Sequence, residues 1–343
     1  MDMDKAYKIC GGMFGAADMT DNGLQVPHFM SEPCLKLLNG RSAIKIAYEH
    51  LAPGKIWMPS FLCHTMLDAL PSDSTIEFYP INTSLHVQDL EWIESVNEND
   101  LVLFIDYFGF NLNEDALKEV KKIGAFVLQD AAQALLSTFD RGYADFVMYS
   151  PRKTLGVPDG GILESRCEIS FDSSKLNEPP SEYVMATYRA FFERGYYDRS
   201  GNGSWFSYYK KAEKLNPAGS YQMSNLAQAL LNRGFDYELI ASQRRKNYKK
   251  ISSELSHIMV LKDLPDNVVP LSCPIMINDR DRLLAQLHEK QFYCPVHWPI
   301  KGVVPEYFED SHDLSNNIIS VLCDQRLSES DLDEMLKVIK ENI

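Results

Sequence analysis

Short apolar runs ended by polar residues constrain the fold of this chain more than any other feature of its sequence. Residues 125–128 lead to Asp130, residues 146–149 stop at Ser150, and residues 160–163 open a third run. Runs of this length, in a chain that also carries helical stretches, are typical of buried strands in a largely parallel sheet. The sequence therefore predicts an α/β fold.

Polar side chains follow the first two of these strands. In open α/β sheets, ligands bind beyond the carboxyl ends of the strands, where Asp130, Ser150 and Lys153 would lie. A carboxylate, a hydroxyl and an amine at this edge suit pyridoxal phosphate (PLP). Lys153 would form the Schiff base, Asp130 would keep the pyridine nitrogen protonated, and Ser150 would hydrogen-bond the phosphate. The alternative is a surface lysine beside a strand-end aspartate, which is what most such residues are.

Length, charge and cysteine content narrow the class of protein. The chain has 343 residues, 45% of them hydrophobic, so it can bury a large core and form two domains. Its net charge of −14 argues against nucleic-acid binding, and no apolar run reaches the roughly 18 residues of a membrane span. The seven cysteines include no Cys-x-x-Cys pair, and the chain starts without a signal-peptide pattern. We therefore expect a cytoplasmic protein with free thiols and no metal site.

The first fifty residues predict an arm and then a helix. Residues 1–30 are irregular and rich in glycine, so we expect an arm that lies on the body or on a partner subunit. Residues 39–43 then open an amphipathic helix through a Gly-Arg-Ser turn. The free N–H groups and the dipole at its start favour a phosphate, although Gly and Ser also serve as ordinary caps.

Hydrophobic patterning predicts the remaining elements. Strands are expected at residues 56–60, 77–80, 101–105, 268–277 and 293–298. Helices are expected at residues 61–70, 87–96, 113–122, 225–255 and 280–290, in a stretch up to about 197, and after a capping box at Ser328. Residues 198–220 are aromatic and rich in lysine, and they are expected to form a loop that packs between subunits or binds a nucleotide.

The strongest motifs carry a resemblance to a known family. They are Asp130-Ala131-Ala132-Gln133-Ala134, Ala144-Asp145-Phe146, Tyr149-Ser150, Lys153 and Asp159-Gly160-Gly161. Together they resemble the DegT/DnrJ/StrS family of PLP-dependent sugar-nucleotide aminotransferases of fold type I. The resemblance implies a large α/β/α domain with a mainly parallel sheet at residues 1–244 and a small α+β domain at residues 245–343. Many members have a longer Ser-Phe-His spacing before the lysine, whereas the spacing here is Ser-x-x-Lys.

The resemblance implies roles for residues around the cofactor. Asp130 is placed at the ring nitrogen, Gln133 near the ring hydroxyl and Lys153 in the covalent linkage. The phosphate is assigned to Ser150, Gly40, Arg41 and Ser42. Cys63 takes the position where family members usually stack an aromatic residue on the ring; the alternative is a buried small side chain, with Phe61 or His64 as the stacking partner.

The resemblance also implies substrate contacts and a partner subunit. Tyr107, Phe108, Arg152 and His297 are expected to face the substrate. Tyr107 and Phe108 could instead be core aromatics, and His297 could be structural. Ser220 stands where the family's turn reaches the cofactor phosphate of the neighbouring subunit in a homodimer.

The predicted activity is therefore transamination with PLP and its amine form, PMP. The amino group would pass from a donor such as glutamate to a keto-sugar, with a nucleotide attached, for surface polysaccharide or amino-sugar biosynthesis. Two alternatives remain open. One is a PLP-dependent sugar dehydratase or lyase, which Lys153 argues against because the family's dehydratases carry a histidine there. The other is a PLP-binding regulatory protein without turnover.

Overall fold

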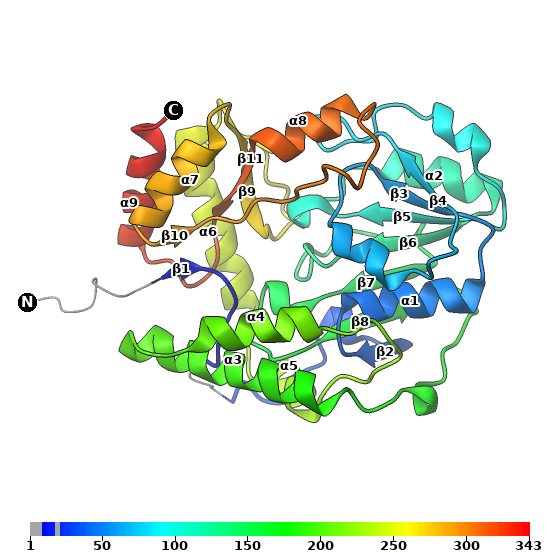
Figure 1. Cartoon of the computed structure of the whole chain (residues 1–343), viewed down its shortest axis with the longest axis horizontal. Helices are drawn as coiled ribbons and strands as arrows, with labels where there is room; N and C mark the ends of the chain where they lie inside the picture. Colours follow the sequence, from blue (N-terminus) through cyan, green and yellow to red (C-terminus); the bar gives the residue numbers. More distant parts are fainter. Residues whose placement is uncertain (1–8, 18–20) are drawn as a thin grey trace, which may run out of the picture.

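The computed structural model describes residues 9–17 and 21–343 (Figure 1). Its largest feature is a seven-stranded sheet with the strand order β2-β8-β7-β6-β5-β3-β4. The strands are β2 (Cys34–Leu37), β3 (Ile56–Pro59), β4 (Ile76–Tyr79), β5 (Leu101–Ile105), β6 (Phe126–Asp130), β7 (Phe146–Tyr149) and β8 (Gly161–Ser165). The pairs among β3 to β7 are all parallel, whereas β8 runs antiparallel to both β2 and β7. The predicted α/β class with a mainly parallel sheet is confirmed.

The apolar runs of the sequence are the central strands. Every residue of β5 and β7 is buried, because both faces of a parallel sheet are covered. β8 passes beneath the start of α1 (Gly40–Leu51), and a Cβ at Gly161 would stand 2.2 Å from the carbonyl group of Asn39. Only glycine permits this close approach, which brings the start of α1 over β8.

Two helices that the sequence predicted on this sheet are confirmed. α1 is capped by Asn39, whose side chain accepts the Ser42 N–H, and it buries Ile44 and Ala47 against β7 and β8. α2 (Glu114–Ile123) packs on β6 and ends at Gly124, which adopts the left-handed conformation typical of a helix end.

Other elements differ from the sequence-based predictions. Residues 61–70 and 87–96 contain only the 3₁₀ helices His64–Ala69 and Glu91–Ser95. The predicted loop at 198–220 contains α4 (Trp205–Leu215), which packs along α3 (Ser181–Ser200) with Trp205 and Ala212 buried. A helical period of seven residues between these two buried positions was the missed signal.

The long helix predicted at 225–255 is two helices, α5 (Asn225–Arg233) and α6 (Tyr237–Leu255). Gly234 ends the first, and the Asp236 side chain accepts the Leu239 N–H to start the second. α6 runs continuously through residue 245, and the domain boundary expected there stays a prediction.

A second sheet lies left of centre in Figure 1, whereas β4 lies at the right. It pairs β9 (Ser272–Met276) with β11 (Ile318–Leu322) in antiparallel register, beside α6, α7 (Arg280–Glu289) and α9 (Glu329–Lys340). The capping box at Ser328 is confirmed. β11 and α8 (Glu309–Asn317) were not predicted, although five consecutive residues of β11 are buried.

The predicted strand at 293–298 is reduced to β10 (Phe292–Tyr293), which pairs in parallel with β1 (Cys10–Gly11). This short pairing holds the described part of the predicted arm against the body. The rest of the expected arm includes residues 1–8 and 18–20, which lie outside the described residues. None of the helices formed by the described residues has both the length and the apolar character that crossing a membrane requires.

Candidate active site

A cavity of about 480 Å³ opens beyond the carboxyl ends of β6 and β7. Its walls come from both sheets and from the segment around β1. Asp130, Ser150 and Lys153 all line it, so the structure brings together the three residues that the strand pattern placed at one edge. Gly40, Arg41, Cys63, Gln133, Arg152 and His297 line the same cavity.

Asp130 is the last residue of β6 and is almost fully buried. Its Oδ1 accepts the N–H of Ala132 at 2.7 Å, which fixes the carboxylate at the strand end. Burial raises the pKa of Asp130 to about 6, although the positive charge of Lys153 and the Ala132 hydrogen bond oppose this shift. The site therefore holds a carboxylate for which a cationic partner inside the cavity would be favourable.

Lys153 is the last residue of a 3₁₀ turn, Pro151–Lys153, that follows β7. Ser150 is the cap residue before this turn. Its side chain is exposed to the cavity, and its charge acts on both Asp130 and His297. Lys153 therefore lines one cavity with the carboxylate of Asp130 and the imidazole of His297.

Gln133 is the residue that best tests whether PLP fits this cavity. Its Oε1 accepts the backbone N–H of Phe108 at 2.6 Å. Its Nε2 is buried without a hydrogen-bond partner among the described residues. An unpaired buried donor is costly, and the ring hydroxyl oxygen of PLP is an acceptor of the required kind. The residues present therefore fit the cofactor.

The start of α1 also lines the cavity, through Gly40 and Arg41. Gly40 lies beside Ser150, since a Cβ on Gly40 would stand 3.9 Å from the Ser150 Cβ. The Arg41 guanidinium donates to the Asn216 carbonyl at 2.6 Å. Ser42 is fully buried, and both its N–H and its hydroxyl bond to the Asn39 side chain, so its hydroxyl is used in capping.

Two residues predicted at the substrate lie in the core. Tyr107 and Phe108 are both fully buried and are not among the residues that line the cavity. The Tyr107 hydroxyl donates to the Phe61 carbonyl, and the Phe108 N–H holds Gln133. Both residues therefore lie behind the residues that line the cavity and hold them in place.

Two other predicted substrate residues line the cavity. The Arg152 guanidinium donates to Glu213 Oε1 at 2.6 Å and to the Tyr183 hydroxyl at 3.3 Å. The Nδ1 of His297 lies 2.6 Å from the hydroxyl of Ser320. Burial lowers the pKa of His297 to about 3, and the charge of Lys153 acts in the same direction. His297 is therefore neutral near pH 7.

Cys63 also lines the cavity, and its Sγ lies 3.2 Å from the Thr65 hydroxyl. The side chain is only partly buried, which differs from the buried packing residue that was its alternative. Phe61 is fully buried against Tyr107 and Trp298.

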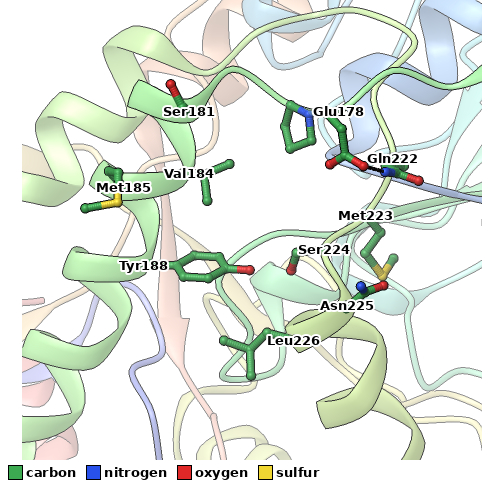
Figure 2. Close-up of a pocket in the computed structure, with 11 residues that line it drawn as sticks. Glu178, Ser181, Val184, Met185, Tyr188, Gln222, Met223, Ser224, Asn225 and Leu226 are labelled. Carbon is green, nitrogen blue, oxygen red and sulfur yellow. Dashed lines mark hydrogen bonds between the residues drawn. The ribbon is translucent and has the colours of Figure 1, made fainter.

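Ser220 lies outside the cavity of its own chain, and its carbonyl accepts the Asn177 N–H at 2.7 Å. A second cavity of about 410 Å³ lies beside this turn, between α3 and the start of α5. Figure 2 shows Tyr188 pointing towards Ser224 across it, with Gln222 bonded to Glu178 at its rim.

The sequence-based reasoning missed several residues of the main cavity. Tyr209, Glu213 and Asn216 come from α4 and the residue after it, whereas Arg244, Ser272, Asp324 and Arg326 come from α6, β9 and the segment after β11. A signal for Arg244 existed, because it shares one face of α6 with the buried Tyr248 and Ile251. A charged residue on the apolar face of a helix needs a buried partner.

The family model described as the DegT/DnrJ/EryC1/StrS aminotransferase family matches residues 34–340. The chain belongs to this family. It is accordingly a PLP-dependent aminotransferase, and the predicted enzyme class and cofactor are confirmed. No curated protein matches the sequence.

Solved structures share the fold at low sequence identity. A DegT DnrJ EryC1 StrS aminotransferase from Brucella abortus matches with a TM-score of 0.62 and 16% identity, over 90% of this chain and 85% of that chain. The Spr1654 protein of Streptococcus pneumoniae in its PMP form matches with a TM-score of 0.66 and 13% identity, over 90% and 85%. The sugar aminotransferase CalS13 from Micromonospora echinospora matches with a TM-score of 0.62 and 12% identity, over 90% and 87%.

Proposed function

We propose that the protein transfers an amino group from glutamate to a keto-sugar that carries a nucleotide, in the cytoplasm, for surface polysaccharide or amino-sugar biosynthesis. The observation that carries the PLP site is the unpaired Nε2 of Gln133, in one cavity with Asp130 and Lys153. Family membership and the structural likeness to a sugar aminotransferase support the acceptor class. The seven free cysteines support a reducing compartment.

We assign the cofactor to residues whose chemistry matches its polar groups. Asp130 would hold the protonated ring nitrogen, and Gln133 Nε2 would donate to the ring hydroxyl. Ser150 and the backbone at Gly40, with Arg41 beside them, would hold the phosphate at the start of α1. When bound, PLP supplies an electron sink that stabilises negative charge on the carbon of the attached amine.

The residues around the cofactor then orient the reacting groups and transfer protons. The amine of Lys153 is exposed in the cavity, so in its neutral form it would accept a proton from the donor's α-carbon in the first half-reaction, and in its protonated form it would donate one to the carbon of the acceptor that is aminated in the second. The ionised form of Asp130 is stabilised by a cationic ring, which offsets the cost of its burial. His297 stays neutral beside Lys153 and, through its hydrogen bond to Ser320, has a fixed ring orientation.

A lyase or dehydratase activity is less favoured by these residues. Lys153 occupies the position and lines the cavity, whereas the family's dehydratases carry a histidine there. A regulatory protein without turnover would not require Asp130, Gln133, Ser150 and Lys153 to meet in one cavity, and here all four do.

We also propose that the active unit is a homodimer in which Ser220 approaches the partner's cofactor phosphate. Two observations support this assignment. Ser220 is absent from the walls of the cavity in its own chain, and the turn that carries it lies at the partly exposed rim of the second cavity. A two-fold axis would make two equivalent sites, each completed by the other chain.

The experiment uses the protein loaded with PMP and a panel of keto-sugars, each offered free and linked to a nucleotide. Return of the absorbance of the PLP form identifies the acceptor and shows whether the nucleotide is needed. Glutamate and other amino acids are tested on the PLP form for the reverse change. Failure of every amino acid to convert the PLP form would contradict the proposed function.

A further inference from the structure

We propose that Arg244 and Ser272 form the binding site for the α-carboxylate of the amino donor. The inference rests on the proposed function, because it names the donor subsite of the same cavity. Both residues line the cavity that holds Lys153, and both come from the part of the chain beyond the large sheet. No ligand-binding role was predicted for either residue from the sequence.

Arg244 is a buried guanidinium that forms no ion pair with a carboxylate of the described residues, although the charge of Asp324 acts on it. Only 1% of its surface is exposed. Its Nε donates to Gln325 Oε1 at 2.8 Å, and its Nη1 donates to the carbonyls of Pro270 and Leu271 at 3.1 and 3.0 Å. Its Nη2 has no partner among the described residues, and within them no acidic side chain lies within ion-pair distance of the guanidinium. Neutral carbonyl and amide groups orient this cation but do not cancel its charge.

The nearby carboxylate of Asp324 is already paired. Arg326 donates to both Asp324 oxygens, from Nε at 3.1 Å and from Nη2 at 2.9 Å. Burial alone would raise the pKa of Asp324, but the charge and hydrogen bonds of Arg326, together with the charge of Arg244, hold it at about 2. Asp324 is hydrogen-bonded to Arg326 and also interacts with the charge of Arg244, so these three groups together carry one net positive charge at this end of the cavity. A buried unpaired charge is costly, so an anion from a ligand would be strongly favoured there.

Ser272 supplies the second, independent observation. It is 3% exposed, and its hydroxyl is buried without a hydrogen-bond partner among the described residues. It follows Leu271, whose carbonyl accepts Arg244 Nη1, and both Ser272 and Arg244 line the cavity. A carboxylate accepts hydrogen bonds from both kinds of donor at once.

Hydrogen bonds connect Arg244 to the segment that carries Lys153. Gln325 accepts from Arg244 and, through Nε2, donates to the carbonyl of Thr154 at 2.9 Å. One side chain therefore connects the guanidinium to the residue that follows Lys153. An amino acid carries its amine and its carboxylate on the same carbon, so a donor held at Arg244 would direct its amine towards the Lys153 side of the cavity.

The anion could also come from the diphosphate of a nucleotide-linked acceptor. A diphosphate carries more charge and more acceptor oxygens than one guanidinium edge and one hydroxyl can satisfy. The next cation, Arg326, is neutralised by Asp324. The observations therefore favour a single carboxylate, which every amino-acid donor has.

The test compares Arg244→Gln and Ser272→Ala with the control Arg245→Gln in the PLP-loaded protein. Arg245 is the next residue of α6, bonds to the Pro265 and Val268 carbonyls and is not among the residues that line the cavity. Conversion of the PLP form is followed with L-glutamate and with its α-amide. Binding of glutarate, which has carboxylates but no amine, and of UDP is measured by calorimetry. Cofactor content and circular dichroism are recorded for each variant.

We expect Arg244→Gln to raise the half-saturating glutamate concentration by about 30-fold and to weaken glutarate similarly, as loss of a charge-assisted hydrogen bond predicts. Ser272→Ala should raise the half-saturating glutamate concentration by about fivefold, as loss of one hydroxyl donor predicts. The wild type should prefer glutamate to its α-amide by about 30-fold, and Arg244→Gln should lose this preference. UDP binding and the Arg245→Gln values should stay within twofold of wild type.

Three results would overturn the proposal. The first is unchanged affinity for glutamate and glutarate in folded Arg244→Gln. The second is a loss of affinity confined to UDP, which would assign the anion to the acceptor. The third is a matching loss of affinity for PLP, which would make Arg244 a cofactor contact. If Arg244→Gln does not fold, Ser272→Ala decides, because it removes no hydrogen bond seen within the described chain. If no amino acid converts the PLP form, the proposed function fails, while the glutarate titration still tests the carboxylate site.

Discussion

Asp130→Asn should separate the contribution of this carboxylate to the reaction rate from its effect on the stability of the fold. The amide oxygen of asparagine can still accept the Ala132 N–H that Asp130 accepts at 2.7 Å, so the strand end should keep its geometry. A neutral amide cannot stabilise a protonated ring nitrogen. Removing a preorganised electrostatic partner of this kind raises the barrier by about 3 kcal/mol, which corresponds to a rate about 150-fold lower.

The same substitution should stabilise the protein without cofactor. Burial raises the pKa of Asp130 to about 6 from an ordinary value of 3.8. An acid with a raised folded pKa destabilises the fold as it ionises, because the unfolded chain releases the proton more readily. This loss of stability begins as the pH rises above the pKa of Asp130 in the unfolded chain, and it is complete above its pKa in the folded protein. It amounts to about 1 kcal/mol at pH 4.5 and to about 3 kcal/mol at pH 7.

Two assays on the Asp130→Asn variant check these opposite signs. Urea unfolding of the cofactor-free proteins at pH 4.5 and 7 should show the variant gaining stability over wild type as pH rises. Single-turnover conversion of the PLP form should show the 150-fold loss with cofactor bound. Near-wild-type turnover would refute the role of Asp130 at the ring nitrogen. Equal stability differences at both pH values would refute the ionised buried carboxylate.

Lys153→Ala should retain PLP without a covalent bond and lose transamination, and borohydride reduction followed by peptide mapping of the wild type should label Lys153; a label on another lysine would contradict the assignment. His297 has a pKa of about 3 in the folded protein. As pH falls, the unfolded chain therefore binds a proton at this residue before the folded protein does. Wild type should lose about 2 kcal/mol of stability from this group when the pH falls from 7.5 to 5.0. In His297→Gln, urea unfolding should show a pH-dependent loss smaller by that amount, and an unchanged slope would count against it. Lys153→Ala subunits mixed with Ser220→Glu subunits should regain part of the activity, since one site of each hybrid dimer lacks both lesions; no recovery in confirmed hybrids would exclude the shared site.

Several predicted features follow directly from local sequence. The apolar runs ending at Asp130 and Ser150 are strands β6 and β7, and the helix that opens at Asn39 is α1. Parallel strands bring their carboxyl ends to the same edge of a sheet, so residues that follow two such strands meet without any knowledge of the rest of the fold. Strand periodicity and sequence spacing were therefore enough to place Asp130, Ser150 and Lys153 together.

Other predictions failed where packing decides the local structure. Residues 205–215 form a helix because Trp205 and Ala212 bury one face against α3, although the segment is rich in aromatics and lysines. Residues 225–255 break at Gly234, where capping by Asp236 competes with continued helix. The second sheet was incomplete in the prediction because β11 pairs with β9 across more than forty residues of chain.

What the sequence determined by itself was the set of strands from β3 to β8, the strand-end lysine and aspartate, and the family motifs around them; β2 was not predicted. What only the tertiary structure decided was the rest of the cavity wall, to which α6 contributes Arg244, β9 contributes Ser272 and the segment after β11 contributes Asp324 and Arg326. The reason is physical. Periodicity and turn chemistry act over a few neighbouring residues, whereas the charge that Arg244 presents depends on which carbonyls, amides and carboxylates packing places around it.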